Sequence, residues 1–269
     1  MEIGIAAWAF NRSILRDKTM TQLEFVAIAR QEYGVDTIEL VSTFFPSQSA
    51  DYLTELRRAI EKERLRVVNI AVDTGHLLRP DLADRKTHLE AMKQWFHVAR
   101  AVGAEAIRVN TGAGSPDDRA ALDMALAGYR ELAEHGAAPG VKLLIENHGG
   151  LSSDAKVIAR LLNEVDPKWF GACPDVDNFP EGTWEEGMKV MAPRSVAVHI
   201  KSAGYDPAGK QASERNGQPH TFDLKRCLQI LRESDYRGPI NYEYNHAETD
   251  EKVGVRKGIE YTRQLLASL

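Results

Sequence analysis

Short apolar runs alternate with longer amphipathic stretches along the whole chain. Eight of the runs have the length and composition of buried β-strands, and each is followed by a stretch with helical periodicity. The runs are EIGIAAW, DTIELVS, RVVNIAV, AIRVNTG, KLLIENH, FGACPDV, VAVHIKS and PINYEYN, beginning at Glu2, Asp36, Arg66, Ala106, Lys142, Phe170, Val196 and Pro239. This alternation predicts repeated βα units built on a parallel sheet.

The amphipathic stretches predict the helices of these units. They cover residues 20–32, 47–63, 83–102, 116–136, 153–165, 182–191, 222–233 and 249–268. Asp154 can cap the start of one helix, and Gly34 and Gly103 stand where two others should end. Eight units without a linker between them predict a single α/β domain over residues 1–269, a (β/α)8 TIM barrel. A doubly wound sheet is the alternative, but no GxGxxG or GxxxxGK[ST] motif follows the first strand.

Composition and charge narrow the class of protein. Hydrophobic residues make up 43% of the chain, and the formal net charge of -5 comes from interspersed charges without a basic stripe. Because a phosphate backbone attracts clustered positive charge, we expect no nucleic acid partner. The first ten residues lack a basic leader, and no apolar run approaches the roughly 20 residues of a membrane span, so we expect no membrane association. Cys173 and Cys227 form no CxxC pair, which favours a reducing, cytoplasmic location.

Ionisable side chains stand at the carboxyl ends of four consecutive predicted strands. In chain order they include Glu146, His148, Asp175, Asp177, His199, Lys201 and Glu243. In a barrel these ends line one mouth, where gathered carboxylates repel one another unless a cation neutralises them. We therefore predict a divalent metal site there. Asp177 is an alternative to Asp175 as a ligand, and Asn147 and His148 are alternatives as hydrogen-bond partners of the ligands.

The residue types also bear on the metal and on the substrate. Carboxylates with one imidazole suit Mn2+ first, with Mg2+, Co2+ or Zn2+ as alternatives. Trp8, with Phe44 and Phe45, could form an apolar wall against a sugar, or could simply pack. Arg108 could bind an anionic group or form a structural ion pair. The long irregular segment Ala203–Thr221 has the composition of a loop that contacts or covers substrate.

Four motifs, IENHGG, CPDVDNF, VAVHIKS and NYEYN, resemble in their order those of the xylose-isomerase-like barrels. This family includes tagatose 3-epimerase, inosose dehydratase and endonuclease IV, and the resemblance covers nearly the whole chain. It implies that Glu146, Asp175, His199 and Glu243 hold the metal. It also implies an isomerase or epimerase that acts on a sugar or sugar-like ketone through an enediolate, with Glu146 and Glu243 exchanging protons with the substrate.

The sequence also departs from its relatives. The epimerases carry a histidine three residues after the strand-six aspartate, where this chain has Asn178, and Asn110 and Asn178 stand in place of zinc ligands of endonuclease IV. DNA repair is therefore not expected. The partner we expect is a small sugar or polyol, and a homo-oligomer is left open. The candidate substrate-binding residues are Trp8, Arg108, His148, Asn178 and Lys201.

Two other functions are weighed against the isomerase. A metal-dependent dehydratase or lyase of a keto-polyol, of the inosose or dehydroshikimate dehydratase type, would need a general acid near the leaving group. His148, Lys201 and His220 are the candidates for that acid. A non-catalytic sugar-binding barrel would have no need of the acids at the strand ends, so their presence argues against it.

Overall fold

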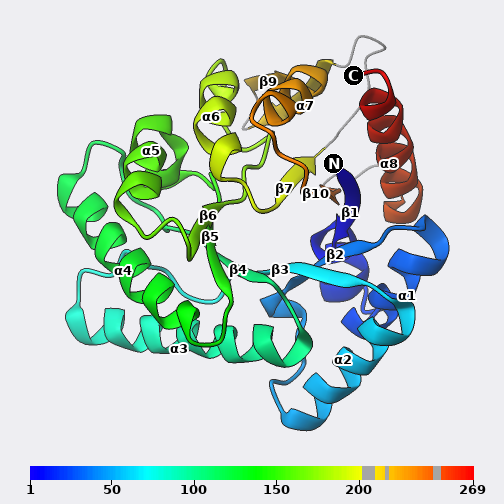
Figure 1. Cartoon of the computed structure of the whole chain (residues 1–269), viewed down its shortest axis with the longest axis horizontal. Helices are drawn as coiled ribbons and strands as arrows, with labels where there is room; N and C mark the ends of the chain where they lie inside the picture. The colour runs from blue at the N-terminus through cyan, green and yellow to red at the C-terminus, as the bar shows by residue number, and fades with distance from the viewer. Residues whose placement is uncertain (202–209, 216–217, 245–249) are drawn as a thin grey trace.

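A parallel β-barrel surrounded by helices forms the centre of the computed structural model, which describes residues 1–201, 210–215, 218–244 and 250–269 (Figure 1). Eight parallel strands form one sheet in the order β6-β5-β4-β3-β2-β1-β10-β7. They are β1 (Glu2–Ala6), β2 (Thr37–Val41), β3 (Arg66–Val72), β4 (Ala106–Val109), β5 (Lys142–Ile145), β6 (Phe170–Ala172), β7 (Val198–Lys201) and β10 (Pro239–Glu243). Two parallel bridges, Ala172 with Ser195 and Asp175 with His199, join β6 to β7. The predicted TIM barrel is confirmed.

The described part of the chain contains all eight predicted helices. They are α1 (Gln22–Tyr33), α2 (Ala50–Glu63), α3 (Leu82–Val102), α4 (Arg119–Ala137), α5 (Ala155–Glu164), α6 (Trp184–Met191), α7 (Leu224–Glu233) and α8 (Glu251–Ala267). Helices α2 and α4 begin later than predicted, because the capping side chains are those of Ser49 and Asp118. Gly34 and Gly103 end α1 and α3 with φ angles of 61° and 78°, a left-handed conformation that glycine adopts without steric cost.

Part of the segment predicted to be irregular is an antiparallel pair of strands. β8 (Lys210–Arg215) and β9 (Gln218–Asp223) pair from Lys210 opposite Asp223 to Arg215 opposite Gln218. The sequence prediction missed this pair because the strands, KQASER and QPHTFD, have no apolar alternation. Residues 202–209 and 216–217 of the segment, and the side chain of the candidate acid His220, lie outside what the structure describes.

Short helical turns follow several strands and shape the mouth of the barrel. The predicted first strand ends at Ala6, and Trp8 lies in the turn η1 (Ala7–Phe10) instead. A π-helical turn, η2 (Arg12–Arg16), follows it, and further turns are η3 (Ser42–Phe44), η4 (Gly150–Ser153) and η5 (Ala192–Arg194). None of the described helices combines the length and apolar character required to cross a bilayer.

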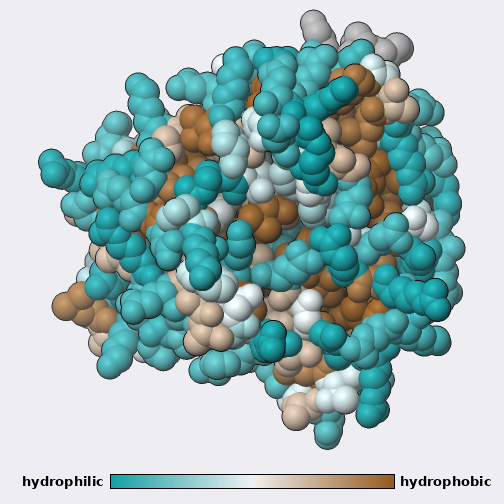
Figure 2. All heavy atoms as spheres, viewed as in Figure 1, coloured by the Kyte–Doolittle hydropathy of each residue, from teal (hydrophilic) through white to brown (hydrophobic). Residues whose placement is uncertain are grey.

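Two groups of apolar residues stabilise the barrel. The larger core lies between the sheet and the helices and includes Ile38, Ile107 and Leu161. A small second cluster consists of Ala106, Leu144, Cys173 and Ala197, packed together as inward-facing residues of neighbouring strands. The face shown in Figure 2 is mostly hydrophilic, with hydrophobic residues visible between the hydrophilic ones and near its middle.

The small cluster fixes where the polar residues of the barrel lie. Successive side chains of a strand point to opposite faces, so residues two positions further along have the same orientation. Two positions beyond the four members of the cluster stand Arg108, Glu146, Asp175 and His199. The apolar cluster therefore forms the floor on which these charged residues are placed.

Candidate metal and catalytic site

A cavity of about 770 Å³ opens at the carboxyl ends of the barrel strands. Most of the residues predicted to bind metal or substrate line it, namely Trp8, Arg108, Glu146, His148, Asn178, Lys201 and Glu243. Asp175 and His199 are completely buried beside these residues. The structure thus brings these nine residues, predicted to bind metal or substrate, to one mouth of the barrel.

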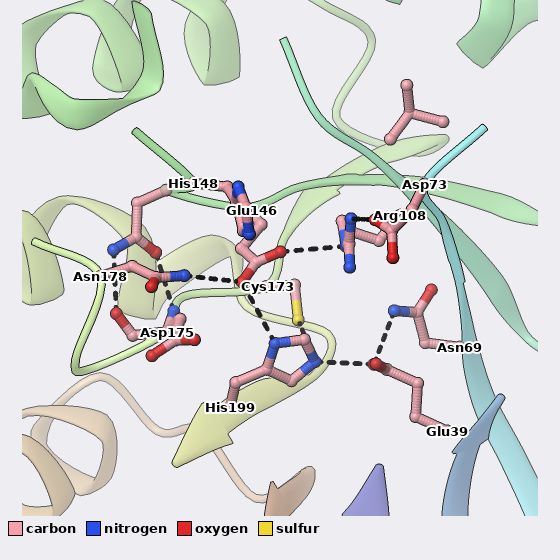
Figure 3. A network of polar contacts seen from close by, with 12 residues as sticks. Glu39, Asn69, Asp73, Arg108, Glu146, His148, Cys173, Asp175, Asn178 and His199 are labelled. Carbon is pink, nitrogen blue, oxygen red and sulfur yellow. Dashed lines mark hydrogen bonds and ion pairs between the residues drawn. The ribbon is translucent and has the colours of Figure 1, made fainter. Parts of the chain in front are cut away.

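His199 lies among the carboxylates (Figure 3). Its Nδ1 atom is 3.4 Å from Oε1 of Glu146 and 3.4 Å from Oε1 of Glu243. One ligand atom each from Glu146, Asp175 and His199 lie within 4.8 Å of one another, and all three residues are buried. Neighbouring and opposite ligands of an ion bound at about 2.1 Å are roughly 3 and 4.2 Å apart. These residues therefore fit a divalent metal.

Of the two candidate aspartates, Asp175 and not Asp177 belongs to the group of ligand atoms within 4.8 Å of one another, and hydrogen bonds hold its backbone in place. The side-chain amide of Asn147 donates to the carbonyl of Asp175 at 2.9 Å and accepts from its N–H at 2.8 Å, which ties the end of β5 to the end of β6. The N–H of Asp177 donates to Oδ1 of Asp175 at 2.9 Å. Asn147 therefore contacts the backbone of a candidate ligand, whereas His148 lines the cavity.

Arg108 is engaged by two carboxylates. Its Nη1 lies 2.5 Å from Oδ1 of Asp73, and its Nε lies 3.0 Å from Oε2 of Glu146. Burial by itself would raise the pKa of Glu146, but the Arg108 guanidinium and the His199 imidazole hold that pKa well below its usual range. Of the two interpretations of Arg108, the structure shows the ion pair.

Lys201 neutralises part of the negative charge of Asp175 and Glu243. Its Nζ forms ion pairs with Oδ2 of Asp175 and, at 3.2 Å, with Oε2 of Glu243, and it donates to Oδ1 of Asn178 at 3.2 Å. Asn178 in turn donates to Oε1 of Glu146 at 3.0 Å. Burial raises the pKa of Asp175 to about 6, against the attraction of Lys201. Asn178, where the epimerases have a histidine, thus bridges Lys201 and Glu146.

The charges of this network do not balance. It joins five carboxylates to the two permanent cations, Arg108 and Lys201, and to one imidazole. Its carboxylates are Glu39, Asp73, Glu146, Asp175 and Glu243. All of them except Asp73 are buried, and buried carboxylates in excess of their partners favour the binding of a further cation.

The aromatic residues near the mouth divide into two groups. Trp8 lines the cavity and stacks on Phe44, with ring centroids 5.9 Å apart and planes within 6°. Phe45 packs edge-on against Trp95 at 5.2 Å and against Tyr52 at 6.0 Å, and it is not among the residues that line the cavity. Of these three aromatic residues only Trp8 lines the cavity, so for Phe44 and Phe45 the structure shows the packing alternative, with the Phe45 ring held by helices α2 and α3.

A family model described as xylose isomerase-like TIM barrel matches residues 27–265. The chain belongs to this family. No curated protein matches the sequence. The resemblance seen in the strand-end motifs is thereby confirmed, and the family extends over nearly all of the barrel.

Solved structures share the fold at low sequence identity. A xylose isomerase-like TIM barrel protein from Mycobacterium smegmatis, in complex with magnesium, has a TM-score of 0.71 and 22% identity, over 99% of this chain and 97% of that one. L-ribulose 3-epimerase has a TM-score of 0.79 and 18% identity, over 99% and 95%. The 3-keto-D-glucoside 4-epimerase of E. coli has a TM-score of 0.74 and 19% identity, over 98% and 99%.

Three residues of the site were not predicted from the sequence. Glu39 was assigned no role, and Asn69 and Asp73 were not considered, yet Glu39 lies 2.7 Å from His199 and Asp73 contacts Arg108. The available signal was a carboxylate in the middle of the apolar strand TIELV, since a buried charge requires a partner. That partner is about 160 residues away in sequence, so the pattern could not name it.

Proposed function

We propose that this protein is a divalent-metal-dependent isomerase or epimerase of an uncharged sugar or sugar-like ketone. The observation that carries the proposal is the gathering of Glu146, Asp175, His199 and Glu243 at adjacent strand ends around one space. The sugar epimerases among the structures of similar fold support the reaction class, and the magnesium complex of the mycobacterial relative supports a divalent ion.

Those four residues would hold the ion. Their oxygen-rich donor set suits Mn2+ first, with Mg2+, Co2+ or Zn2+ as alternatives. When bound, the ion would supply an electrophile for the carbonyl and the adjacent hydroxyl of a ketose. The remaining chemistry falls to the side chains around the cavity.

Two glutamates have the placement needed to move the proton of the substrate. Glu146 and Glu243 both line the cavity, and each lies 3.4 Å from the same Nδ1 of His199. Arg108 and His199 keep the pKa of Glu146 low, so this carboxylate is ionised but only weakly basic, and its removal of a proton from the carbon next to the carbonyl would depend on the acidity that a bound ion gives that carbon. Glu243, protonated beforehand from solvent, would deliver its proton to the resulting enediolate from the other side, which leaves Glu146 protonated and Glu243 ionised.

The charges of the site favour an uncharged substrate. Arg108 and Lys201 are both engaged by carboxylates of the protein. Even with a divalent ion added, the network has no excess of positive charge to offer a phosphate or a carboxylate. Trp8, stacked on Phe44, presents its ring to the cavity, where it can cover the C–H face of a sugar.

A dehydratase of a keto-polyol is the second candidate. The observation that favours it is that His148 and Lys201 line the same cavity as the glutamates and could protonate a leaving hydroxyl. Lys201 is the weaker of the two, because its two carboxylate partners raise the pKa of its ammonium despite burial, which makes it a reluctant acid.

One experiment separates the two functions. The Mn2+-loaded protein is incubated in deuterated solvent with a panel of neutral ketoses and keto-polyols, and products are followed by NMR. We expect deuterium at the carbon beside the carbonyl together with the epimer or isomer. Loss of water to give an unsaturated product would establish the dehydratase instead. No exchange with any member of a broad panel would count against both.

A further inference from the structure

Glu39 is a carboxylate inside the barrel that does not reach the cavity. It lies on β2 and is completely buried, and it is absent from the residues that line the cavity. Its Oε2 accepts a hydrogen bond from Nδ2 of Asn69 at 2.8 Å and lies 2.7 Å from Nε2 of His199 (Figure 3). Glu39 is therefore linked to the cavity through its contact with His199.

The contact with Glu39 distinguishes the two nitrogens of the imidazole. A carboxylate only accepts hydrogen bonds, so a nitrogen 2.7 Å away carries the proton, and this nitrogen is Nε2. Nδ1 points the other way, toward Glu146 and Glu243 at 3.4 Å each. In the neutral imidazole, Nδ1 then has the lone pair that a metal needs.

We propose that Glu39, supported by Asn69, is a positioning residue that holds His199 with Nδ1 facing the carboxylates of the site. The inference rests on the proposed function for the identity of what His199 binds. Histidine ligands of metals commonly donate their other N–H to a carboxylate, which fixes the ring and its tautomer. Here that carboxylate comes from β2, on the far side of the barrel from the ligands.

A rival arrangement uses the same imidazole in the opposite sense. Glu39, Cys173 and His199 also offer ligand atoms within 4.8 Å of one another, and Sγ of Cys173 lies 3.4 Å from Nε2. However, two atoms bound to one ion at about 2.0–2.2 Å in a tetrahedral site are more than 3 Å apart. The 2.7 Å between Oε2 of Glu39 and Nε2 of His199 is the length of a hydrogen bond.

Substitutions of Glu39 test the positioning role. Glu39→Met keeps the volume but removes both oxygens, and we expect Mn2+ and Co2+ to bind about 10–100-fold more weakly, as for other supporting residues of metal sites. Glu39→Gln retains an oxygen that can accept from Nε2 and should recover most of the affinity. Thr37→Val is the matched control, because Thr37 is buried on the same strand with the same orientation and has no contact with His199. It should bind both ions like the wild type.

Equal affinity of Glu39→Met and wild type, or an equal loss in Thr37→Val, would overturn the proposal. If Glu39→Met does not fold, NMR of the wild-type protein tests the positioning role instead. With 15N-labelled histidines and bound Mg2+ or Zn2+, long-range 1H–15N spectra should show His199 protonated at Nε2 and bound at Nδ1, with His199→Gln identifying the signals. Binding through Nε2, or a thiolate charge-transfer band of the Co2+ form that disappears in Cys173→Ser, would overturn it.

The outcomes also distinguish this proposal from the proposed function. An ion bound through Nδ1 in a protein that exchanges no substrate proton would leave the positioning role intact and remove the sugar isomerase. Substrate proton exchange in a protein that binds the ion through Nε2 would leave the sugar isomerase intact and remove the positioning role. A protein that binds none of Mn2+, Co2+, Mg2+ and Zn2+ would remove both.

Discussion

The two halves of the barrel contribute to the site in different ways. Strands β5, β6, β7 and β10 place carboxylates and an imidazole where an ion and a substrate can reach them. Strands β2 and β4 place Glu39 and Arg108, which contact His199 and Glu146 respectively, and Asn69 of β3 donates a hydrogen bond to Glu39. In the proposed function one half would carry the chemistry, and the other half would orient it and set its charge.

This division makes different predictions for substitutions in the two halves. A group that touches the ion or the substrate should be required outright, whereas a supporting group should change affinity or stability by a measurable but limited factor. The division between the two halves would be wrong if a supporting residue proved indispensable or a ligand proved dispensable.

The largest effect is expected at Glu146 and Glu243, the two glutamates at the mouth of the barrel. Glu146→Gln and Glu243→Gln keep the size and one ligand oxygen but lose basicity, so substrate proton exchange should fall about 10²–10⁴-fold at saturating Mn2+. A two-base epimerase should also lose exchange from one epimer more than from the other in each variant. Deuterium incorporation followed by NMR measures both effects.

Glu164→Gln is the control for these variants, because Glu164 pairs with Arg160 on the surface, at 2.6 Å. It should exchange protons like the wild type. Near wild-type exchange in both Glu146→Gln and Glu243→Gln would mean that the glutamates are ligands only. The base would then have to be sought among His148, Lys201 and Asp177.

Direct ligands should affect metal affinity more than supporting residues do. His199→Gln and Asp175→Asn each remove one donor of the buried set. We expect each to weaken Mn2+ binding, measured by calorimetry, by more than the loss of about 10–100-fold expected for Glu39→Met. His88→Gln, at a half-buried histidine of α3 close to Asp84, should bind normally. Full-affinity binding in His199→Gln would exclude the assigned site.

Arg108 tests the supporting half through stability. Removing one partner of a buried ion pair leaves an uncompensated charge, so Arg108→Met should lower the free energy of unfolding of the metal-free protein by about 3–5 kcal/mol. Arg160→Met removes an exposed pair with Glu164, which solvent screens, and should lower the free energy of unfolding far less. Urea unfolding compares the two. Equal midpoints would show that Glu146 does not need its guanidinium partner.

Chelation should give the smallest effect. An ion present at 100 times its Kd stabilises the folded protein by about 2.7 kcal/mol, which for a barrel of this size is a rise in Tm of roughly 5–10 °C. Melting in Mn2+ and in excess chelator should differ by that amount in the wild type and hardly at all in His199→Gln. The same shift in both proteins would place the ion elsewhere.

Much of this protein could be predicted from local patterns. The βα alternation identified the eight strands and helices, since the burial of each element depends on its own periodicity. The strand-end motifs identified Glu146, Asp175, His199 and Glu243, because the ends of parallel strands meet at one edge. The pair β8 and β9 was missed, since polar strands that pair through backbone hydrogen bonds show no alternation.

What the sequence determined by itself was therefore the barrel and the set of groups at its mouth, both of which follow from the order of side chains along each strand. Only the tertiary structure decided which groups meet across the barrel. Glu39 of β2 faces His199 of β7 across the barrel, a contact that depends on the curvature that closes the sheet. Arg108 of β4 joins Asp73 and Glu146, which follow the neighbouring strands β3 and β5, and no pattern within a single strand records either contact.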